Sequence, residues 1–572
     1  MRLTLRLLSS VVQKTPFYIT TPIFYVNAAP HIGHLYTAVV ADAIQRFEKL
    51  TNPDYQIVFS TGTDEHGTKI QQAAAKAKLS LPEYCTNISE EYKQLFKEFN
   101  VDYTDFIRTT EERHKTAVRH FWNKLVEEDH IYKAKYSGWY SVNDEAFVPE
   151  THVKDELRDG ENVKVSIESG HKVEWTEETN YMFRLSAFKV HLKNWLKTDG
   201  VITPVKFQTQ LQEMVADDAY LPDISVSRPS SRVHWAIRVP NDEEQSIYVW
   251  LDALINYLSV LGYPQREAMT SRGHVWPPAL HVLGKDILKF HGIYWPAFLM
   301  AVKWHPPRRL VCHSHWTVDG SKMSKSLGNV VDPRSSRVGN EALRYLLLRE
   351  ATMASDANYS ETKLINIANA ELADTLGNLA SRCCGAALNP RHEFPALHAS
   401  VLTSVATTQH ASDLMRAVEE LPEICHGHYR NYHFYKAVDA VIRTLHIANL
   451  FFETSKPWEL RKKPETQKEL DVILHLTMET LRICGIILQP IIPQMTKTLL
   501  DKLQIGRDCR NWQHCETPSW RLKGAIYETK NIQSGKFVLF QRIYDKKVSQ
   551  AELRKNASEE KKKKAQKKKV TA

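Results

Sequence analysis

The N-terminal part of the chain alternates between the pattern of a buried strand and the pattern of an amphipathic helix. Residues 17–24 are apolar and β-branched, as in a buried strand, and a turn-forming stretch follows at 27–30. Apolar residues then recur at helical spacing over 33–50, and a second strand pattern occupies 56–60. Such alternation predicts an α/β fold with a doubly wound parallel sheet. Ligands of these sheets bind at the carboxyl ends of the strands, where we expect 61–67 to form a polar loop.

The rest of the chain changes character twice. One stretch has scattered glycines and many charges, which indicates a domain inserted into the sheet domain. A later stretch has few glycines and long helical periodicity, which predicts an α-helical bundle. The predicted domains are the two halves of the sheet domain at 17–119 and 226–309, the inserted domain at 120–225, a loop region at 310–340, the helical domain at 341–540, and a disordered Lys-rich tail at 541–572.

Charge is concentrated at the two ends of the chain. The formal net charge is +9, yet residues 545–572 hold eleven Lys and Arg against four Asp and Glu, and residues 42–544 hold 61 against 62. Net charge is therefore no argument for nucleic-acid binding. Residues 1–16 are Leu-rich, carry Arg and lack acids, which predicts a mitochondrial transit peptide, with a frayed N-terminus as the alternative. No apolar run approaches 20 residues, so we expect no membrane span.

Eight cysteines are spread through the sequence without a C-x-x-C pair. They form no dense framework, which is typical of a reducing compartment. A zinc site built from cysteines is therefore not expected.

The motif His31-Ile-Gly33-His34 stands where the first strand gives way to the helix. A helix N-terminus offers free N–H groups and attracts phosphate. Gly33 would let a nucleoside approach the backbone, and two imidazoles one turn apart could donate hydrogen bonds to charge that develops on an α-phosphate. Taken alone, the motif is also compatible with two structural histidines at a helix start.

A second motif, Lys322-Met-Ser324-Lys325-Ser326, follows a glycine-containing stretch. Two lysines on such a loop could close over a triphosphate and neutralise charge moving onto pyrophosphate. An isolated Lys/Ser stretch can equally be a solvated loop. Together and in this order, the two motifs resemble the paired signatures of class I aminoacyl-tRNA synthetases.

Further segments resemble the methionyl-tRNA synthetases in particular. They are ITTPIFYVN at 19–27, TGTDEHGT at 61–68, YVWLDA at 248–253, and GKDI at 284–287 with Phe290, His291 and the YWP stretch at 294–296. The resemblance covers residues 17–540. It implies a Rossmann-like class I catalytic domain with an inserted connective domain, followed by an α-helical anticodon-binding domain.

The resemblance also implies the substrate pocket. The matching methionine-binding positions are Ile23, Tyr25, Asp64, Trp250, Ala253, Leu254, Tyr257, Ile287, Phe290, His291 and Trp295. Aromatic side chains suit a thioether, although each could instead be plain core. Asp64 would hold the ammonium group, and Tyr257 and His291 would lie near the sulfur. Arg228 matches an arginine close to the family's active site, with a surface salt bridge as the alternative.

One departure from the family pattern concerns metal. Several relatives carry cysteine zinc knuckles in the inserted domain, but Ser141 and Asp144 stand where a C-x-x-C would lie. His152 and His171 cannot complete a four-ligand site by themselves, so we predict a zinc-free insert. The insert is also too short to resemble the editing domains of leucyl, isoleucyl and valyl enzymes.

The helical domain carries the positions that match anticodon contacts. Asn378 and Arg382 stand one helical turn apart, and Asn449 and Trp458 match the other two positions. Trp can stack on a splayed base while Asn and Arg bind its edges. The alternative for Trp458 is a hydrophobic residue that caps a helix after Pro457.

The resemblance implies an enzyme that uses ATP with Mg²⁺ to join L-methionine to initiator and elongator tRNA(Met), with methionyl-adenylate as intermediate, and the N-terminal residues 1–16 indicate the mitochondrial matrix. We expect a monomer without membrane association. Three alternatives remain: another class I synthetase, a nucleotidyltransferase with the same fold, and a non-catalytic RNA-binding paralogue. The last would have decayed motifs, and both motifs are intact.

Overall fold

The protein was analysed as a computed structural model. It describes residues 16–141, 146–148, 150–158, 161–167, 169–217, 221–265, 275–323, 328–522 and 529–544. The predicted transit peptide, apart from Pro16, and the Lys-rich tail beyond 544 lie outside the described residues. So do three positions of the lysine motif, Ser324, Lys325 and Ser326.

A six-stranded parallel sheet forms the centre of the N-terminal half. Its order is β3-β2-β1-β14-β15-β9, with β1 at Pro16–Tyr25, β2 at Gln56–Asp64, β3 at Asp105–Arg108, β9 at Ile202–Thr203, β14 at Leu280–Gly284 and β15 at Leu310–His313. From β1 the chain builds towards β3, whereas β15 extends the sheet from β14 in the other direction. The boundary between β1 and β14 is therefore the switch point at which such sheets bind ligands.

Helices α1 (Ile32–Thr51), α2 (Thr68–Ala77) and α3 (Leu81–Glu98) connect the first three strands. Helix α1 is buried along most of its length. It packs against β1 and β14 on one side and against α11 (Asn340–Glu350) on the other, which explains its dense run of apolar residues. The α/β prediction is confirmed.

The segment between β3 and β14 contains antiparallel sheets as well as helices. One sheet has the order β10-β8-β4-β5, with β4 at Ile131–Ser141, β5 at Ala146–Val148, β8 at Glu174–Phe183 and β10 at Ile224–Ser225. A hairpin joins β6 (Val153–Arg158) to β7 (Glu161–Ser166), and a small sheet combines β11 (Ser227–Pro229), β12 (Arg238–Val239) and β13 (Asp242–Ile247). The α-helices described here are α4 (Glu112–Glu127), α5 (Lys189–Leu196), α6 (Val205–Ala216), α7 (Val249–Leu254) and α8 (Asn256–Ser259). Strand β9, from the predicted insert, joins the parallel sheet.

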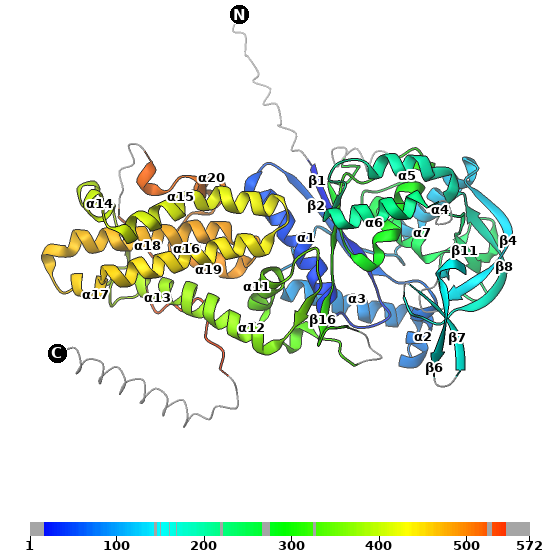
Figure 1. Cartoon of the computed structure of the whole chain (residues 1–572), viewed down its shortest axis with the longest axis horizontal. Coiled ribbons are helices and arrows are strands. Elements are labelled where there is room, and N and C mark those ends of the chain that lie inside the picture. Colours follow the sequence, from blue (N-terminus) through cyan, green and yellow to red (C-terminus); the bar gives the residue numbers. More distant parts are fainter. Residues whose placement is uncertain are drawn as a thin grey trace, which may run out of the picture.

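The C-terminal half is helical. Figure 1 shows it at the opposite end of the molecule from β4 and β8. Its main helices are α12 (Glu361–Ile367), the π-helix η7 (Ala368–Gly377), α13 (Asn378–Cys384), α14 (Ala399–Val405), α15 (Gln409–Arg430), α16 (Phe434–Ser455), α17 (Pro457–Leu460), α18 (Gln467–Ile487), α19 (Pro493–Lys502) and α20 (Gln513–Glu516). No helix among the described residues is both long enough and apolar enough to cross a membrane.

A fully buried arginine on α11 joins the two halves. The Nε of Arg344 donates to the carbonyl of Ile491 at 2.8 Å, and its Nη2 donates to the carbonyl of Pro490 at 3.0 Å. The same guanidinium forms an ion pair with Asp42 on α1. Because one charged group bonds to both halves, they share a fixed boundary as well as a continuous apolar core.

Two sequence expectations about local structure were wrong. Residues 61–64 were expected in a loop, but they continue β2, where they are buried between β1 and β3. Gly62 is required there, since a Cβ would lie 2.0 Å from the carbonyl oxygen of Ile107. The short apolar run at 246–250 likewise predicts a strand, but β13 ends at Ile247, and Val249–Leu254 is helix α7. Short apolar runs fit a strand and a buried helix equally well.

Candidate active site

A cavity of about 350 Å³ opens at the carboxyl ends of β1 and β14. The last residues of these adjacent strands, Tyr25 and Gly284, both line it. Most of the predicted site residues do so as well: Ile23, Tyr25, His31, Gly33, His34, Asp64, Trp250, Ala253, Leu254, Tyr257, Ile287, His291 and Lys322. Both sequence motifs therefore contribute to one cavity at the switch point of the sheet.

The histidine motif forms the start of α1. His31 caps the helix, and its Nδ1 accepts a hydrogen bond from the backbone N–H of Gly33 at 3.0 Å. Nδ1 of His34 accepts from the backbone N–H of His31 at 3.1 Å and lies 3.1 Å from the hydroxyl of Tyr92. An imidazole that accepts at Nδ1 carries its proton on Nε2 when neutral. Both rings are therefore Nε2–H donors. They also stack on each other, with their centroids 3.8 Å apart.

Gly33 is required by this cap. A Cβ at this position would lie 2.9 Å from Cε1 of His31, closer than real Cβ contacts. From the sequence alone, Gly33 is expected only to let a nucleoside approach the backbone. The structure adds that any larger residue would push the His31 ring out of its capping position.

Aromatic rings form one end of the cavity. Trp250 and Phe290 stack with centroids 3.6 Å apart and planes at 6°. Nε2 of His291 lies 2.7 Å from the hydroxyl of Tyr257, and Nδ1 of His291 lies 3.0 Å from the carbonyl of Ile287. A carbonyl only accepts, so Nδ1 carries the proton and Tyr257 donates to Nε2. Burial lowers the pKa of His291 to about 4, which keeps this ring neutral at physiological pH.

Three predicted residues lie outside the lining of this cavity. Phe290 supports Trp250 by stacking on it. Trp295 has no exposed surface and packs 5.9 Å from the Tyr257 ring, which is the plain-core alternative. Arg228 is 4% exposed and lines a separate hollow beside Tyr248, whose ring lies 4.4 Å from the guanidinium.

The structure does not support the salt-bridge alternative for Arg228. Its Nη1 donates to Ser225 Oγ at 2.9 Å and to the carbonyl of Ser227 at 2.7 Å. Within the described part of the chain it makes no ion pair. A resemblance to a family indicates which sequence positions match its active site, but it does not show how deeply each side chain is buried.

The lysine motif begins on a small sheet of β16 (Trp316–Val318), β17 (Ser321–Lys322) and β18 (Ala357–Tyr359). The Nζ of Lys322 lies 3.7 Å from a carboxylate oxygen of Asp286, whose other oxygen lies 3.3 Å from Nε2 of His315. Lys322 is 64% exposed in its side chain, so this ion pair is weak and easily exchanged for another anion.

Fourteen residues that line the cavity were not among the predicted site residues: Pro22, Phe24, Tyr36, Thr37, Lys69, Val249, Asn256, Gly284, Asp286, His313, Ser314, His315, Trp316 and Met323. His313 ends β15, and its Nε2 lies 2.8 Å from the hydroxyl of Thr37 on α1. The sequence contained an indication of this residue, because the polar stretch HSH at 313–315 directly follows an apolar, strand-like run at 310–312. Ligands of parallel sheets bind at such carboxyl ends of strands.

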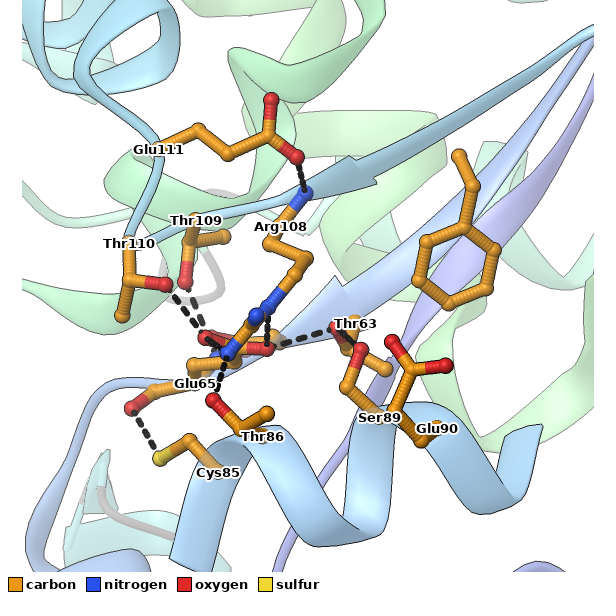
Figure 2. Close-up of polar contacts among 12 residues, drawn as sticks. Thr63, Glu65, Cys85, Thr86, Ser89, Glu90, Arg108, Thr109, Thr110 and Glu111 are labelled. Carbon is orange, nitrogen blue, oxygen red and sulfur yellow. Dashed lines mark hydrogen bonds and ion pairs between the residues drawn. The ribbon is translucent and has the colours of Figure 1, made fainter. Parts of the chain in front are cut away.

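Asp64 ends β2 at the cavity, and the next residue anchors the chain behind it. The buried carboxylate of Glu65 accepts from Arg108 Nε at 2.7 Å and from the hydroxyls of Thr63 and Thr110 at 2.9 and 2.5 Å. Figure 2 shows these groups converging on Glu65 from β2, from β3 and from the turn that follows β3. A buried carboxylate with this many donors holds its backbone in one place.

The predicted anticodon residues gather on the helical half. Arg382 on α13 forms an ion pair with Glu453, and its guanidinium lies 4.9 Å from the ring of Phe452 and 5.5 Å from that of Trp458. Asn449 on α16 donates to the carbonyl of Thr375 at 3.2 Å. Asn378 is exposed at the start of α13. Together these side chains form a partly exposed aromatic and basic surface, and the helices that carry them, α13, α16 and α17, lie in the half of the molecule away from β4 and β8 (Figure 1).

The described residues contain no group of three or more His, Cys, Asp or Glu side chains that could hold a metal ion. Ser141, one of the two positions at which relatives have cysteines, is buried in β4. Asp144, the other, lies outside the described residues. The zinc-free insert therefore stays a prediction.

Comparison with known proteins identifies the family. Residues 17–384 match the family "tRNA synthetases class I (M)", and residues 401–560 match "Anticodon binding domain of methionyl tRNA ligase". The chain is 47% identical to the human mitochondrial methionine–tRNA ligase over 86% of this chain and 85% of that protein. It is 41% identical to the Xenopus laevis mitochondrial methionine–tRNA ligase over 93% of this chain and 94% of that one.

Among solved structures, the chain resembles Mycobacterium tuberculosis methionyl-tRNA synthetase in complex with methionyl-adenylate. The TM-score is 0.83 at 34% identity, and the match covers 92% of this chain and all of that chain. A parallel sheet with the histidine motif at a helix start and the lysine motif at the same cavity defines the class I aminoacyl-tRNA synthetases. Within that class, the chain belongs to the methionine–tRNA ligase family.

Proposed function

We propose that this chain joins L-methionine to tRNA(Met) in two steps, with ATP consumed and AMP and pyrophosphate released. One observation carries the proposal: a single cavity at the switch point contains the histidine pair, Asp64, Lys322 and an aromatic slot. The histidine pair and Lys322 suit a triphosphate. Asp64 and the aromatic slot suit an amino acid with an apolar side chain.

The first step is the activation of methionine. A carboxylate oxygen of methionine attacks the α-phosphorus of ATP, and the bond from that phosphorus to the bridging oxygen of the β-phosphate breaks. Pyrophosphate leaves with the bond electrons, and methionyl-adenylate remains. No protein nucleophile is needed, so catalysis consists of positioning and charge stabilisation.

The protein groups have distinct roles in this step. His31 and His34 present Nε2–H donors, which stabilise negative charge that develops around the α-phosphate. Lys322 exchanges its weak pairing with Asp286 for the phosphates. Lys325, with Ser324 and Ser326, would complete the grip on the leaving pyrophosphate. Gly33 and the N-terminus of α1 bind the nucleotide between them.

Methionine is recognised at its two ends. Asp64 accepts hydrogen bonds from the ammonium group, and the sulfur lies in the aromatic slot against Tyr257 and His291. Ile23, Tyr25, Ala253, Leu254 and Ile287 provide the remaining apolar walls. Phe290 and Trp295 act from behind the slot by supporting Trp250 and Tyr257, and Arg228 is placed beside Tyr248 rather than in the slot.

Magnesium belongs with the nucleotide. Among the described side chains, no set of three candidate ligands gathers in one place, so the ion is expected to arrive on the phosphates, where it neutralises their charge. The protein residues then act on the ATP complex as a whole.

In the second step, the 2′-hydroxyl of the terminal tRNA ribose attacks the activated carbonyl, and AMP leaves. Selection of the tRNA uses the anticodon surface. Trp458, with Arg382 beside it, offers a face on which a base stacks, and Asn378 on α13 and Asn449 on α16 would bind base edges. Both initiator and elongator tRNA(Met) share the anticodon that this surface would read.

The curated relatives reported above are mitochondrial proteins. We place this chain in the mitochondrial matrix, with residues 1–16 as the transit peptide, and we propose that it acts as a monomer. Fusion of residues 1–16 to a fluorescent protein tests the targeting. Cytosolic fluorescence would contradict it.

The function is tested by charging. The purified chain, ATP and labelled methionine are incubated with a tRNA(Met) transcript. Label should be transferred to this RNA and not to a matched transcript with an altered anticodon. Equal charging of the two transcripts would contradict the anticodon role, and charging of neither would contradict the function itself.

A further inference from the structure

A buried carboxylate lies between two histidines behind the cavity wall. Oδ2 of Asp252 lies 2.7 Å from Nδ1 of His66, and Oδ1 lies 2.7 Å from Nε2 of His114. Asp252 and His114 have no exposed surface, and His66 has 3%. The three side chains come from different elements, since His66 follows β2, Asp252 is on α7 and His114 is on α4.

Both oxygens of Asp252 are thus occupied by imidazole N–H groups. Burial alone would raise the pKa of Asp252, but the two imidazoles outweigh it and lower the pKa to about 2. The group is therefore ionised at neutral pH. His114 is fixed on its other side, where Nδ1 lies 3.0 Å from the hydroxyl of Ser259.

None of these three side chains lines the cavity, but their chain neighbours do. His66 stands two residues after Asp64, and its backbone N–H points to Oδ1 of Asp64 at 3.5 Å. Asp252 stands two residues after Trp250 and directly before Ala253, both of which line the aromatic slot. The contact from His66 to Asp252 therefore ties the residue that would hold the ammonium group to the wall that would hold the thioether.

The other side of Asp64 is tied as well. Glu65 bonds to Arg108 and to Thr110, which anchors the same turn to β3 (Figure 2). The Glu65 contacts fix the turn to the sheet, whereas the His66 contact fixes it to α7. Only the second can set the distance between Asp64 and Trp250, because Trp250 belongs to α7.

From this geometry we infer that Asp252 is a positioning residue that acts through His66 to place Asp64 relative to the aromatic slot. The inference rests on the proposed function. Replacement of a buried charged pair by well-packed apolar residues is often neutral or stabilising, so the presence of Asp252 needs a reason beyond packing. Simultaneous binding of an ammonium group and a thioether, at a fixed separation, provides that reason.

The test compares two ligands that differ in one group. L-Methionine has both the ammonium group and the thioether, and 4-(methylthio)butanoate lacks only the amino group. Binding of each to the full chain is measured by titration calorimetry, for the wild type and for Asp252→Asn. We expect Asp252→Asn to weaken methionine binding by about 10-fold, since a charge-assisted hydrogen bond is misplaced, and to leave binding of the deamino ligand unchanged.

A matched control is available in the helical half. Glu479 is 2% exposed and pairs with Arg482, so Glu479→Gln makes the same carboxylate-to-amide change at a buried site remote from the cavity. It should alter neither affinity. Should Asp252→Asn fail to fold, His66→Leu removes the same contact from the other side and should give the same ligand-dependent loss.

Equal losses for both ligands would overturn the inference, because they would indicate general damage to the site. Unchanged binding of both ligands would overturn it as well. A wild-type chain that binds neither ligand would instead contradict the proposed function, so the two failures are distinguishable.

Discussion

The hydroxyl of Tyr257 lies 2.7 Å from Nε2 of His291, at the aromatic end of the cavity. His291 is oriented by the carbonyl of Ile287, so Tyr257 must donate this hydrogen bond. The pair forms a polar contact in an otherwise apolar slot. In the proposed function it lies against the methionine sulfur.

Tyr257→Phe removes the hydroxyl and keeps the ring. It should lower kcat/KM for methionine in ATP–pyrophosphate exchange by about 10-fold, the cost of one lost buried hydrogen bond with its partner left unsatisfied. Norleucine, which has a methylene in place of the sulfur, should lose less. The measurement is the ratio of kcat/KM for methionine to kcat/KM for norleucine. An unchanged ratio would show that Tyr257 and His291 do not recognise the sulfur.

Lys325→Ala should slow methionine activation by about 100-fold or more while methionine affinity changes little, because the lysine acts on pyrophosphate rather than on the amino acid. Lys322→Ala should act in the same direction. Single-turnover formation of the adenylate measures the rate. Lys303→Ala is the control, since this exposed lysine pairs with Glu128 away from the cavity. Wild-type rates in both Lys325→Ala and Lys322→Ala would exclude the lysine motif from catalysis.

Trp458→Ala should lower the rate of tRNA charging by about 10-fold or more, because the stacking of a base on an aromatic ring is lost. Methionine-dependent pyrophosphate exchange should remain at the wild-type rate, since the cavity is in the other half. Trp520→Ala, which changes a tryptophan held by Glu419 elsewhere in the helical half, is the control. Parallel losses of charging and exchange would point to unfolding instead.

Acid should destabilise the fold through its buried neutral histidines. Burial lowers the pKa of both His291 and His313 to about 4. In the unfolded chain, an imidazole takes up its proton near pH 6.5. Between these values the unfolded state binds more protons, so the free energy of unfolding falls by about 1.4 kcal/mol per pH unit for each histidine, and the fall stops below about pH 4.

The melting temperature between about pH 7 and pH 5 checks this sign. His313→Asn should melt with a shallower dependence on pH than the wild type, because one of the titrating groups is gone. Identical slopes would show that His313 is protonated equally in both states.

The inserted domain should contain no zinc. Elemental analysis of the purified chain, after dialysis against a weak chelator, should find far less than one zinc per chain. Treatment with a strong chelator should leave the melting temperature unchanged, because no structural metal is removed. Stoichiometric zinc would require ligands that the sequence pattern at 136–144 does not suggest.

Local patterns made much of the fold predictable. The strand at 17–24 and the helix over 33–50 follow from residues near one another in sequence, and the structure has β1 and α1 there. Patterns of this kind could not distinguish a strand from a buried helix at 249–254, since both leave a short apolar run. They also could not show that Asp64 ends a strand rather than lying in a loop.

Contacts between distant parts of the sequence were not predictable. Asp252 meets His66 across 186 residues and His114 across 138, and His313 meets Thr37 across 276. No spacing rule connects such positions, because only the folded sheet brings them together. The resemblance supplied the positions of the pocket, but it did not show that Trp295 is fully buried or that Arg228 lies in a separate hollow.

In the proposed function, one cavity activates methionine with ATP. Pyrophosphate exchange measured separately with each of the standard amino acids tests it most directly. We expect rapid ATP-dependent exchange with methionine and negligible exchange with every other amino acid. Absence of exchange with methionine, or faster exchange with a different amino acid, would contradict it.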